Sequence, residues 1–201
     1  MSQRSSESTE RPSPVNAIPE QQILDAAYEL MLAVGMRRMT MADIARHAEV
    51  SRATLYRRWP NVQSVVAALM TREWAIAGAA AFVPGADARS WLVEGVVEVV
   101  NLTRTHPLMR KIIELDPEFL TPYLFERRGS STNDHLELVE RALQKGYEDG
   151  SIRLGDPEWQ ARTIVLAAFS SAVSGPIMAE PDEYDRLDEE LRQMLDRYLA
   201  P

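Results

Sequence analysis

Cysteine is absent from this 201-residue chain, which excludes disulfides, thiolate nucleophiles, iron–sulfur clusters and the usual zinc frameworks. The three histidines, His47, His106 and His135, show no close metal-ligand spacing, so we expect neither a metal nor another cofactor. The chain also lacks an uncharged apolar run of about 18 residues, and its N-terminus lacks the apolar core of a signal peptide. These absences predict a cytoplasmic protein that does not cross a membrane.

Catalytic signatures are missing as well. The sequence contains no HExxH motif, no GxSxG motif and no phosphate-binding loop. Asp134 next to His135, and His106 near Glu114, are the residues that an acid–base pair could use. Because neither pair belongs to a catalytic motif, we expect the protein not to be an enzyme.

Strand-like alternation of apolar and polar residues is also absent, and no repeat period recurs. Apolar residues recur at helical spacing instead, which predicts an all-α fold of about nine helices. Residues 1–17 are rich in Ser, Glu and Pro and are expected to be a disordered arm. A first domain should span residues 18–63 and a second 64–201, with prolines dividing the segment around 107–122 into short pieces.

The segment from Met39 to Met70 carries the most specific pattern in the chain. Thr40 can cap a short helix, Glu49 and Val50 form a turn, and Ser51 can cap a second short helix. Small and apolar residues occupy the inner faces of both helices: Ile44, Ala45, Ala48 and Leu55. This spacing predicts a helix-turn-helix whose outward face carries Arg52, Ala53, Thr54, Tyr56, Arg57 and Arg58.

Basic charge is concentrated around this helix pair, although the chain carries a net charge of −8. Seven arginines and two acidic residues lie between positions 36 and 72, whereas 13 basic and 23 acidic residues follow position 72. A local excess of arginine attracts phosphates, and an acidic remainder is repelled by them. The distribution therefore predicts a protein with one DNA-facing end on an acidic body.

The sequence ADIARHAEVSRATLYRRWPN, with a bracing helix before it and an apolar helix after it, resembles the TetR family of bacterial transcriptional regulators over about residues 19–70. The resemblance implies an all-α fold with an N-terminal three-helix helix-turn-helix DNA-binding domain and a C-terminal helical ligand-binding and dimerisation domain. It also implies a homodimer that binds double-stranded DNA at a palindromic operator. A ligand would release the DNA by changing the spacing of the two DNA-reading ends.

Carried onto this sequence, the resemblance implies DNA contacts along the helix pair. Thr40 would donate to a phosphate at a helix N-terminus. Ser51, Arg52 and Thr54 would approach base edges or adjacent phosphates in the major groove. Tyr56 would bind the DNA backbone.

The same resemblance leaves the end of the second helix and two departures from the family pattern to be considered. Arg57 and Arg58 would add positive charge, although Arg58 could instead shield Trp59. Glu49 occupies the turn where glycine is usual, and a left-handed conformation there would cost about 1 kcal/mol. Val62 stands where the family often has a lysine, which removes one phosphate contact.

Small residues crowd the helix expected at about 156–178, and an apolar stripe runs along the helix expected at about 182–199. Small residues permit close helix approach. These last two long helices could therefore form a four-helix bundle across a two-fold axis of a homodimer. Packing within one chain is the alternative explanation.

Large side chains on the central helices are candidates either for a ligand-binding site or for the core: Trp74, Trp91, Met109, Phe119, Tyr123 and Phe169. Asn101, Arg104 and His106 could orient a carbonyl or carboxylate, or could cap helix carbonyls. We expect a small, mostly apolar effector with one polar end, such as a drug-like compound, a fatty acyl derivative or an acyl lactone.

Two functions remain open from the sequence. The first is a ligand-responsive homodimeric transcriptional repressor that a small amphipathic effector releases from its operator. The alternative is an all-helical small-molecule-binding protein without DNA-binding activity, which the unusual turn residue and Val62 favour.

Overall fold

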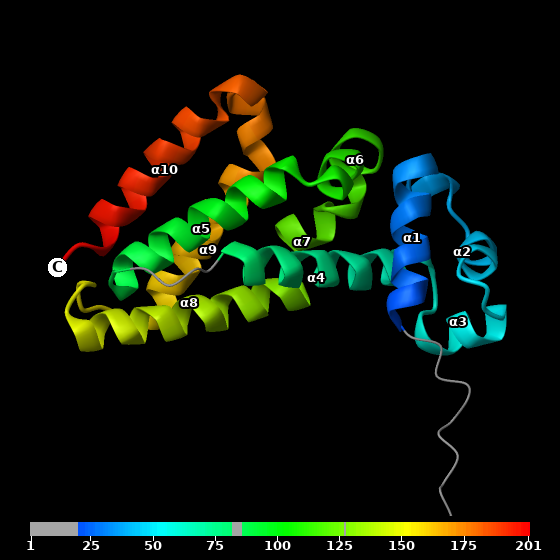
Figure 1. Cartoon of the computed structure of the whole chain (residues 1–201), viewed down its shortest axis with the longest axis horizontal. Coiled ribbons are helices and arrows are strands. Elements are labelled where there is room, and N and C mark those ends of the chain that lie inside the picture. Colours follow the sequence, from blue (N-terminus) through cyan, green and yellow to red (C-terminus); the bar gives the residue numbers. More distant parts are fainter. Residues whose placement is uncertain (1–19, 82–85, 127) are drawn as a thin grey trace, which may run out of the picture.

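The computed structural model describes residues 20–81, 86–126 and 128–201 as an elongated arrangement of helices (Figure 1). No strand occurs among these residues, which confirms the predicted all-α class. Four elements gather at one end and form what we call the head: α1 (Glu20–Val34), the 3₁₀-helix η1 (Met36–Arg38), α2 (Met41–His47) and α3 (Arg52–Arg58). The expected arm, residues 1–17, lies outside the described residues.

The helix α4 (Val62–Ala81) leads from the head into the remaining helices, which we call the body. The body continues with α5 (Ala88–Thr105), α6 (Pro107–Leu115), η2 (Pro117–Phe119), α7 (Thr121–Phe125), α8 (Ser130–Asp149), α9 (Pro157–Met178), η3 (Pro181–Glu183) and α10 (Tyr184–Leu199).

Prolines begin the short elements of the body. Pro107, Pro117 and Pro122 each occupy the first or second position of α6, η2 or α7, where the missing N–H is not needed for a helical hydrogen bond. The predicted division of this segment into short pieces is therefore confirmed, and the prolines act as helix starts.

One hydrophobic core joins the head to the near end of the body. It contains residues of α1, α2 and α3, the first half of α4, and three residues of α6: Leu108, Met109 and Ile112. The core crosses the domain boundary expected after residue 63, because α4 and α6 both pack against the head. A movement of α4 or α6 would consequently act on the head directly.

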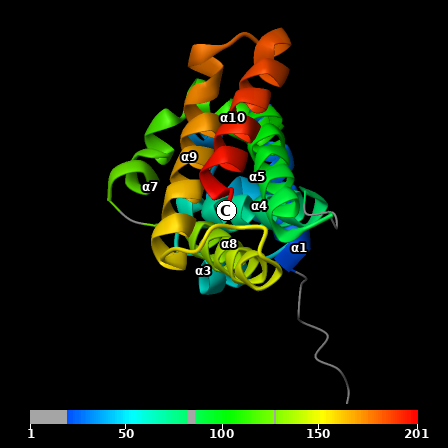
Figure 2. The same ribbon diagram turned by 90° about the vertical axis from the view of Figure 1, so that its left-hand side faces the viewer.

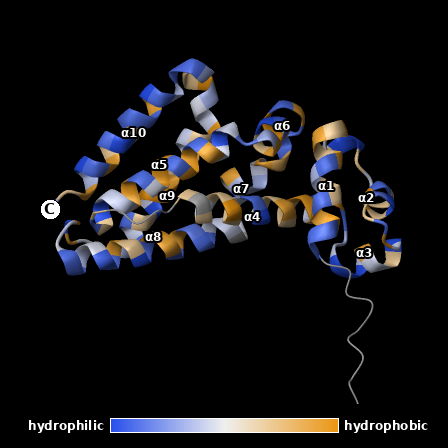
Figure 3. Cartoon of the chain, in the orientation of Figure 1, coloured by the Kyte–Doolittle hydropathy of each residue, from blue (hydrophilic) through white to orange (hydrophobic). Residues whose placement is uncertain are grey.

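A second core fills the far end of the body, among α5, α8, α9 and α10 (Figure 2). Along α10, hydrophobic residues recur between hydrophilic ones in Figure 3, and Leu191, Leu195 and Leu199 are the buried members of that stripe. Of the stripe predicted for this helix, Leu191 and Leu195 are buried, Leu187 and Tyr198 are half-buried, and Met194 is 50% exposed.

Among the described residues, α9 is the one helix that is long and apolar enough to cross a membrane by length and composition alone. The core helix of a soluble protein passes the same test, and α9 packs against α5, α8 and α10. Apolar side chains nevertheless remain exposed on it at Leu166, Ile177 and Met178. The helix is thus apolar on its buried and its exposed faces.

Candidate functional site

Each of the two short helices in the head begins with a side-chain cap. The Thr40 hydroxyl accepts a hydrogen bond from the Asp43 N–H at 3.1 Å, and the Asp43 carboxylate accepts one from the Thr40 N–H at 3.2 Å. The Ser51 hydroxyl accepts from the Thr54 N–H at 3.0 Å. The helix-turn-helix predicted from sequence is therefore present, with both caps formed.

In the turn between α2 and α3, Glu49 adopts the left-handed conformation, with φ of 53°. Across this turn the Val50 N–H donates to the Ala45 carbonyl at 2.9 Å, and Ala45 is only 2% exposed. The strain at Glu49 is about 1 kcal/mol, and the packed Ala45 with its hydrogen bond offsets it. The motif thus survives the loss of the usual glycine.

The helix α3 buries Leu55 and presents its other side chains outward. Tyr56 is 53% exposed, and the Thr54 hydroxyl forms a hydrogen bond with the Ser51 hydroxyl at 2.8 Å. We call five of the outward residues of α3 the recognition face: Arg52, Ala53, Thr54, Tyr56 and Arg57. The two arginines of this face form no ion pair within the described residues, which leaves their charge available to an anion.

Arg58, the last residue of α3, is also exposed, but its side chain is engaged with other parts of the head. Its guanidinium pairs with Glu20 of α1 and stacks over the Trp59 ring, 5.3 Å from the centroid. Trp59 itself is 6% exposed. This geometry favours the shielding role of Arg58 over a contact with DNA.

Thr40 is already engaged within its own capping box. Its hydroxyl donates to the Asp43 carboxylate at 2.6 Å, and this hydrogen bond is the main reason why the pKa of Asp43 lies below its ordinary value. Arg46 pairs with the same carboxylate at 2.5 Å. A phosphate contact from Thr40 would therefore require its hydroxyl to turn away from Asp43.

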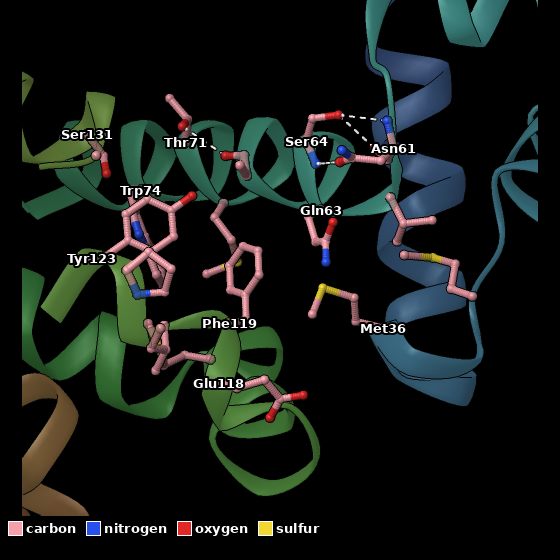
Figure 4. A pocket seen from close by; sticks show the side chains of 18 of the residues that line it. Met36, Asn61, Gln63, Ser64, Thr71, Trp74, Glu118, Phe119, Tyr123 and Ser131 are labelled. Carbon is pink, nitrogen blue, oxygen red and sulfur yellow. Dashed lines mark hydrogen bonds between the residues drawn. The ribbon is translucent and has the colours of Figure 1, made fainter. Parts of the chain in front are cut away.

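A groove of about 1110 Å³, which we call the outer groove, runs between the head and the body. Figure 4 shows Gln63 and Trp74 of α4 on the side of that helix that faces Phe119 and Tyr123 of the η2–α7 segment. The head contributes lining residues from η1, α2 and α3. Small-molecule sites usually measure about 300–1,000 Å³, so the outer groove can hold a drug-sized molecule.

The wall of the outer groove is tied to the head by Asp116, which lies between α6 and η2. The Asp116 side chain is 1% exposed and accepts a hydrogen bond from the Met36 N–H of η1 at 2.9 Å. In η2, Glu118 pairs with Arg37 of η1 at 2.6 Å. The residues around η2, which line the groove, therefore hold η1, which precedes the helix-turn-helix.

A second cavity of about 100 Å³, which we call the inner chamber, lies among α4, α5, α8 and α9. It adjoins the outer groove, because five residues line both spaces: Trp74, Met109, Ser131, Thr132 and Phe169. The remaining lining residues are apolar except for Thr103 and His135.

The ligand-binding residues predicted from sequence divide into two groups. Five line one or both cavities: Trp74, Met109, Phe119, Tyr123 and Phe169. The other four line neither cavity: Trp91, Asn101, Arg104 and His106.

Asn101 and Arg104 hold α5 to α10. Arg104 is 2% exposed and pairs with Asp188 at 2.6 Å, and Asn101 donates to the same carboxylate at 3.1 Å. Tyr184 stacks on the Arg104 guanidinium at 4.2 Å. These polar groups face α10 rather than a cavity, so their partners are protein side chains.

His106 and Trp91 also have partners within the fold. The Nδ1 atom of His106 accepts from the Leu108 N–H at 3.3 Å and caps α6, and its Nε2 atom lies 3.4 Å from Glu73. Trp91 packs against the second core. His106 therefore caps a helix, as the alternative supposed, but at an N–H of the helix start and not at helix carbonyls.

Two residues of the site were not assigned from sequence. His135 was considered for a metal site and for an acid–base pair but not for a ligand-binding site, although its helical spacing from Leu138 and Val139 indicates an inward face. Asp116 had no local signal, because its partner Met36 lies 80 residues away.

Comparison with known sequences agrees with this geometry. The model of the family "Bacterial regulatory proteins, tetR family" matches residues 23–69. An HTH-type transcriptional regulator of Mycobacterium tuberculosis is 34% identical over 179 residues, which make up 89% of this chain and 93% of that relative. YdeS of Bacillus subtilis, also an HTH-type transcriptional regulator, is 29% identical over 136 residues, or 62% of this chain and 64% of that relative.

Solved structures share the fold. The TetR family repressor AlkX from Dietzia superposes with a TM-score of 0.67 at 21% identity, over 90% of this chain and 94% of that one. SmeT in complex with triclosan gives 0.62 at 21% identity, over 90% and 91%. FadR of Bacillus subtilis in complex with stearoyl-CoA gives 0.64 at 17% identity, over 90% and 100%. At these identities the likeness concerns the fold alone.

Proposed function

Because the chain belongs to the TetR family of bacterial transcriptional regulators, we propose that it is a homodimeric repressor that binds a palindromic operator and is released by a small amphipathic effector. It is a transcriptional regulator, not an enzyme, and we place it in the cytoplasm with its operator. The observation that carries the proposal is the recognition face of α3, where the exposed Arg52 and Arg57 have no acidic partner within the described residues.

The recognition face supports two kinds of DNA contact. Arg52 and Thr54 lie in the first turn of α3, the part of a recognition helix that reaches base edges in the major groove. Tyr56 and Arg57 follow toward the end of the helix and would bind phosphates, which positions the protein without reading sequence.

Selection of bound fragments from random duplex DNA by the full chain, repeated at increasing salt, tests the proposal. We expect enrichment of a palindrome and a steep decrease in affinity with salt. The charge reversal Arg52→Glu with Arg57→Glu should abolish binding. Arg141→Ala, which removes an exposed arginine from α8, is the matched control and should leave binding unchanged.

Failure to enrich any sequence would favour the alternative, a helical small-molecule-binding protein without DNA-binding activity. Undiminished binding by the charge-reversed protein would show that another surface reads DNA.

A second copy of the chain would cover the exposed apolar residues of the last two long helices. Leu166, Ile177 and Met178 of α9 are at least 70% exposed, and Met194 of α10 is 50% exposed. Because exposed apolar residues of this size on adjacent helices are typical of an interface, Leu166→Asp is expected to give monomers in light scattering, with weak operator binding. A persistent dimer would place the interface elsewhere.

The outer groove supports the role of an effector site, because both head and body contribute to its walls. The fold neighbours SmeT and FadR were solved with triclosan and with stearoyl-CoA. A molecule in the groove would press on η2, whose neighbour Asp116 and whose Glu118 hold η1. The effector would thereby favour a head position that does not fit the operator, to the extent that it binds the two states differently.

A further inference from the structure

The inner chamber differs chemically from the outer groove beside it. None of its 16 lining residues is an aspartate, glutamate, lysine or arginine, whereas the outer groove includes Arg37, Glu118 and Arg128. Valine, leucine, isoleucine and alanine side chains from α5, α8 and α9 supply most of the chamber wall. A charged group placed in the chamber would lose its hydration without gaining an opposite charge.

His135 is the one titratable residue in the lining of the inner chamber. Its ring forms no hydrogen bond with the residues that the structure describes. Burial lowers the pKa of His135 below its ordinary value, although the neighbouring Asp134 opposes this effect. The imidazole is therefore neutral at pH 7 and offers one N–H donor and one nitrogen acceptor to a ligand.

We propose that the inner chamber binds an uncharged, oxygen-bearing apolar group of the effector, such as a phenol or an alcohol, and that His135 determines this preference. The inference deepens the proposed function, since it names the chemistry that the effector must present. A hydroxyl group can donate to the unprotonated nitrogen of His135 or accept from its N–H. Thr103 and Thr132 lie in the same lining and can complete the hydrogen bonds of the ligand.

The size of the chamber places the remainder of the effector in the outer groove. About 100 Å³ is too small for a whole drug-sized ligand, but Trp74, Met109 and Phe169 line both spaces. Methionine adapts readily to the shape of a ligand because its side chain has three rotatable bonds. A molecule that passes these side chains can place one end beside His135 and the other in the outer groove.

Three probes of matched shape test the proposal by isothermal titration against the full chain at pH 7.5: 4-butylphenol, butylbenzene and 4-butylbenzoate. We expect 4-butylphenol to bind most tightly and 4-butylbenzoate to bind at least about tenfold more weakly, because a buried carboxylate has no partner in the chamber. His135→Leu should weaken 4-butylphenol about tenfold and leave butylbenzene unchanged.

Two further variants separate the hydrogen bond from general effects on the fold. His135→Gln retains a donor and an acceptor, so it should keep the preference for 4-butylphenol over butylbenzene. His47→Gln changes a histidine of α2 that pairs with Glu29 away from both cavities, and it should bind all three probes as the unchanged protein does.

The proposal is overturned if 4-butylbenzoate binds as tightly as the phenol, if His135→Leu retains the preference for the phenol, or if none of the three probes binds. None of these outcomes concerns DNA. If the chain selects a palindrome but binds no probe, the proposed repressor function stands and the proposed ligand preference of the inner chamber is refuted. If it binds the probes but not DNA, the ligand preference stands and the repressor function is refuted.

Discussion

The head and the body of this protein differ in how far apart along the chain their contacting residues lie. In the head, Thr40 binds Asp43 and Ser51 binds Thr54, so each cap joins residues three positions apart. In the body, Arg104 pairs with a residue 84 positions away. Short-range contacts can be predicted from the sequence pattern, whereas long-range contacts depend on how the helices assemble. The two regions should therefore respond differently to substitution.

The largest effect is expected at the buried ion pair of the body. Asp188→Leu would leave Arg104 buried and unpaired, at a cost of about 3–5 kcal/mol in the free energy of unfolding. Urea denaturation followed by circular dichroism at one protein concentration measures this cost. Glu94→Ala breaks the exposed pair with Arg192 and should cost less than about 1 kcal/mol. Equal losses of stability in the two variants would show that burial of an ion pair does not determine how much its loss destabilises the protein.

A smaller loss is expected where the body holds the head. Asp116→Ala leaves the Met36 N–H without its acceptor, which costs about 1–3 kcal/mol. Hydrogen exchange of the Met36 amide should become faster in this variant. Glu118→Ala removes only the exposed pair with Arg37 and should leave that amide protected. Unchanged exchange in Asp116→Ala would mean that the core alone positions η1.

Within the head, Ser51→Ala removes the cap of α3 and should cost about 1 kcal/mol. Thermal unfolding measures the loss. Since α3 has only seven residues, operator affinity should fall together with stability. A loss of affinity without any loss of stability would indicate instead that the Ser51 hydroxyl contacts DNA.

Glu49→Gly should act in the opposite direction. Glycine adopts φ of 53° without the steric penalty of a side chain, so the head should gain up to about 1 kcal/mol. Thermal unfolding tests this gain, and Glu29→Gly in the middle of α1 serves as a control that should destabilise the protein. A destabilised Glu49→Gly protein would show that the Glu49 side chain has a favourable role.

The smallest effect on stability is expected from the titration of His135. Its pKa is lower in the folded chain than the ordinary value, so the unfolded chain binds the proton more readily. The contribution of His135 to stability is therefore complete above about pH 6.5 and decreases as the pH falls toward the lower folded value. His135→Leu should flatten the dependence of stability on pH between about 7 and 5. An identical profile in both proteins would contradict the burial of this imidazole.

The helix-turn-helix of the head was predictable because its signals are local. The caps, the turn and the inward Leu55 lie within one short segment and agree with one another. The sequence also identified the unusual turn at Glu49, and the structure adds that this residue adopts the left-handed conformation rather than avoiding it. The sequence did not decide whether Arg58 contacts DNA or shields Trp59, because its partner Glu20 is 38 residues away.

The body shows where local signals end. Sequence alone determined that it is helical, where its last two long helices lie, and which large side chains were candidates for a cavity. Only the tertiary structure decided that Met109 and Phe169 line a cavity while Arg104 binds Asp188 in the interior. Helical periodicity shows which residues share a face, because that depends on neighbours three and four positions apart. It does not show what the face packs against, because that depends on helices brought together from distant parts of the chain.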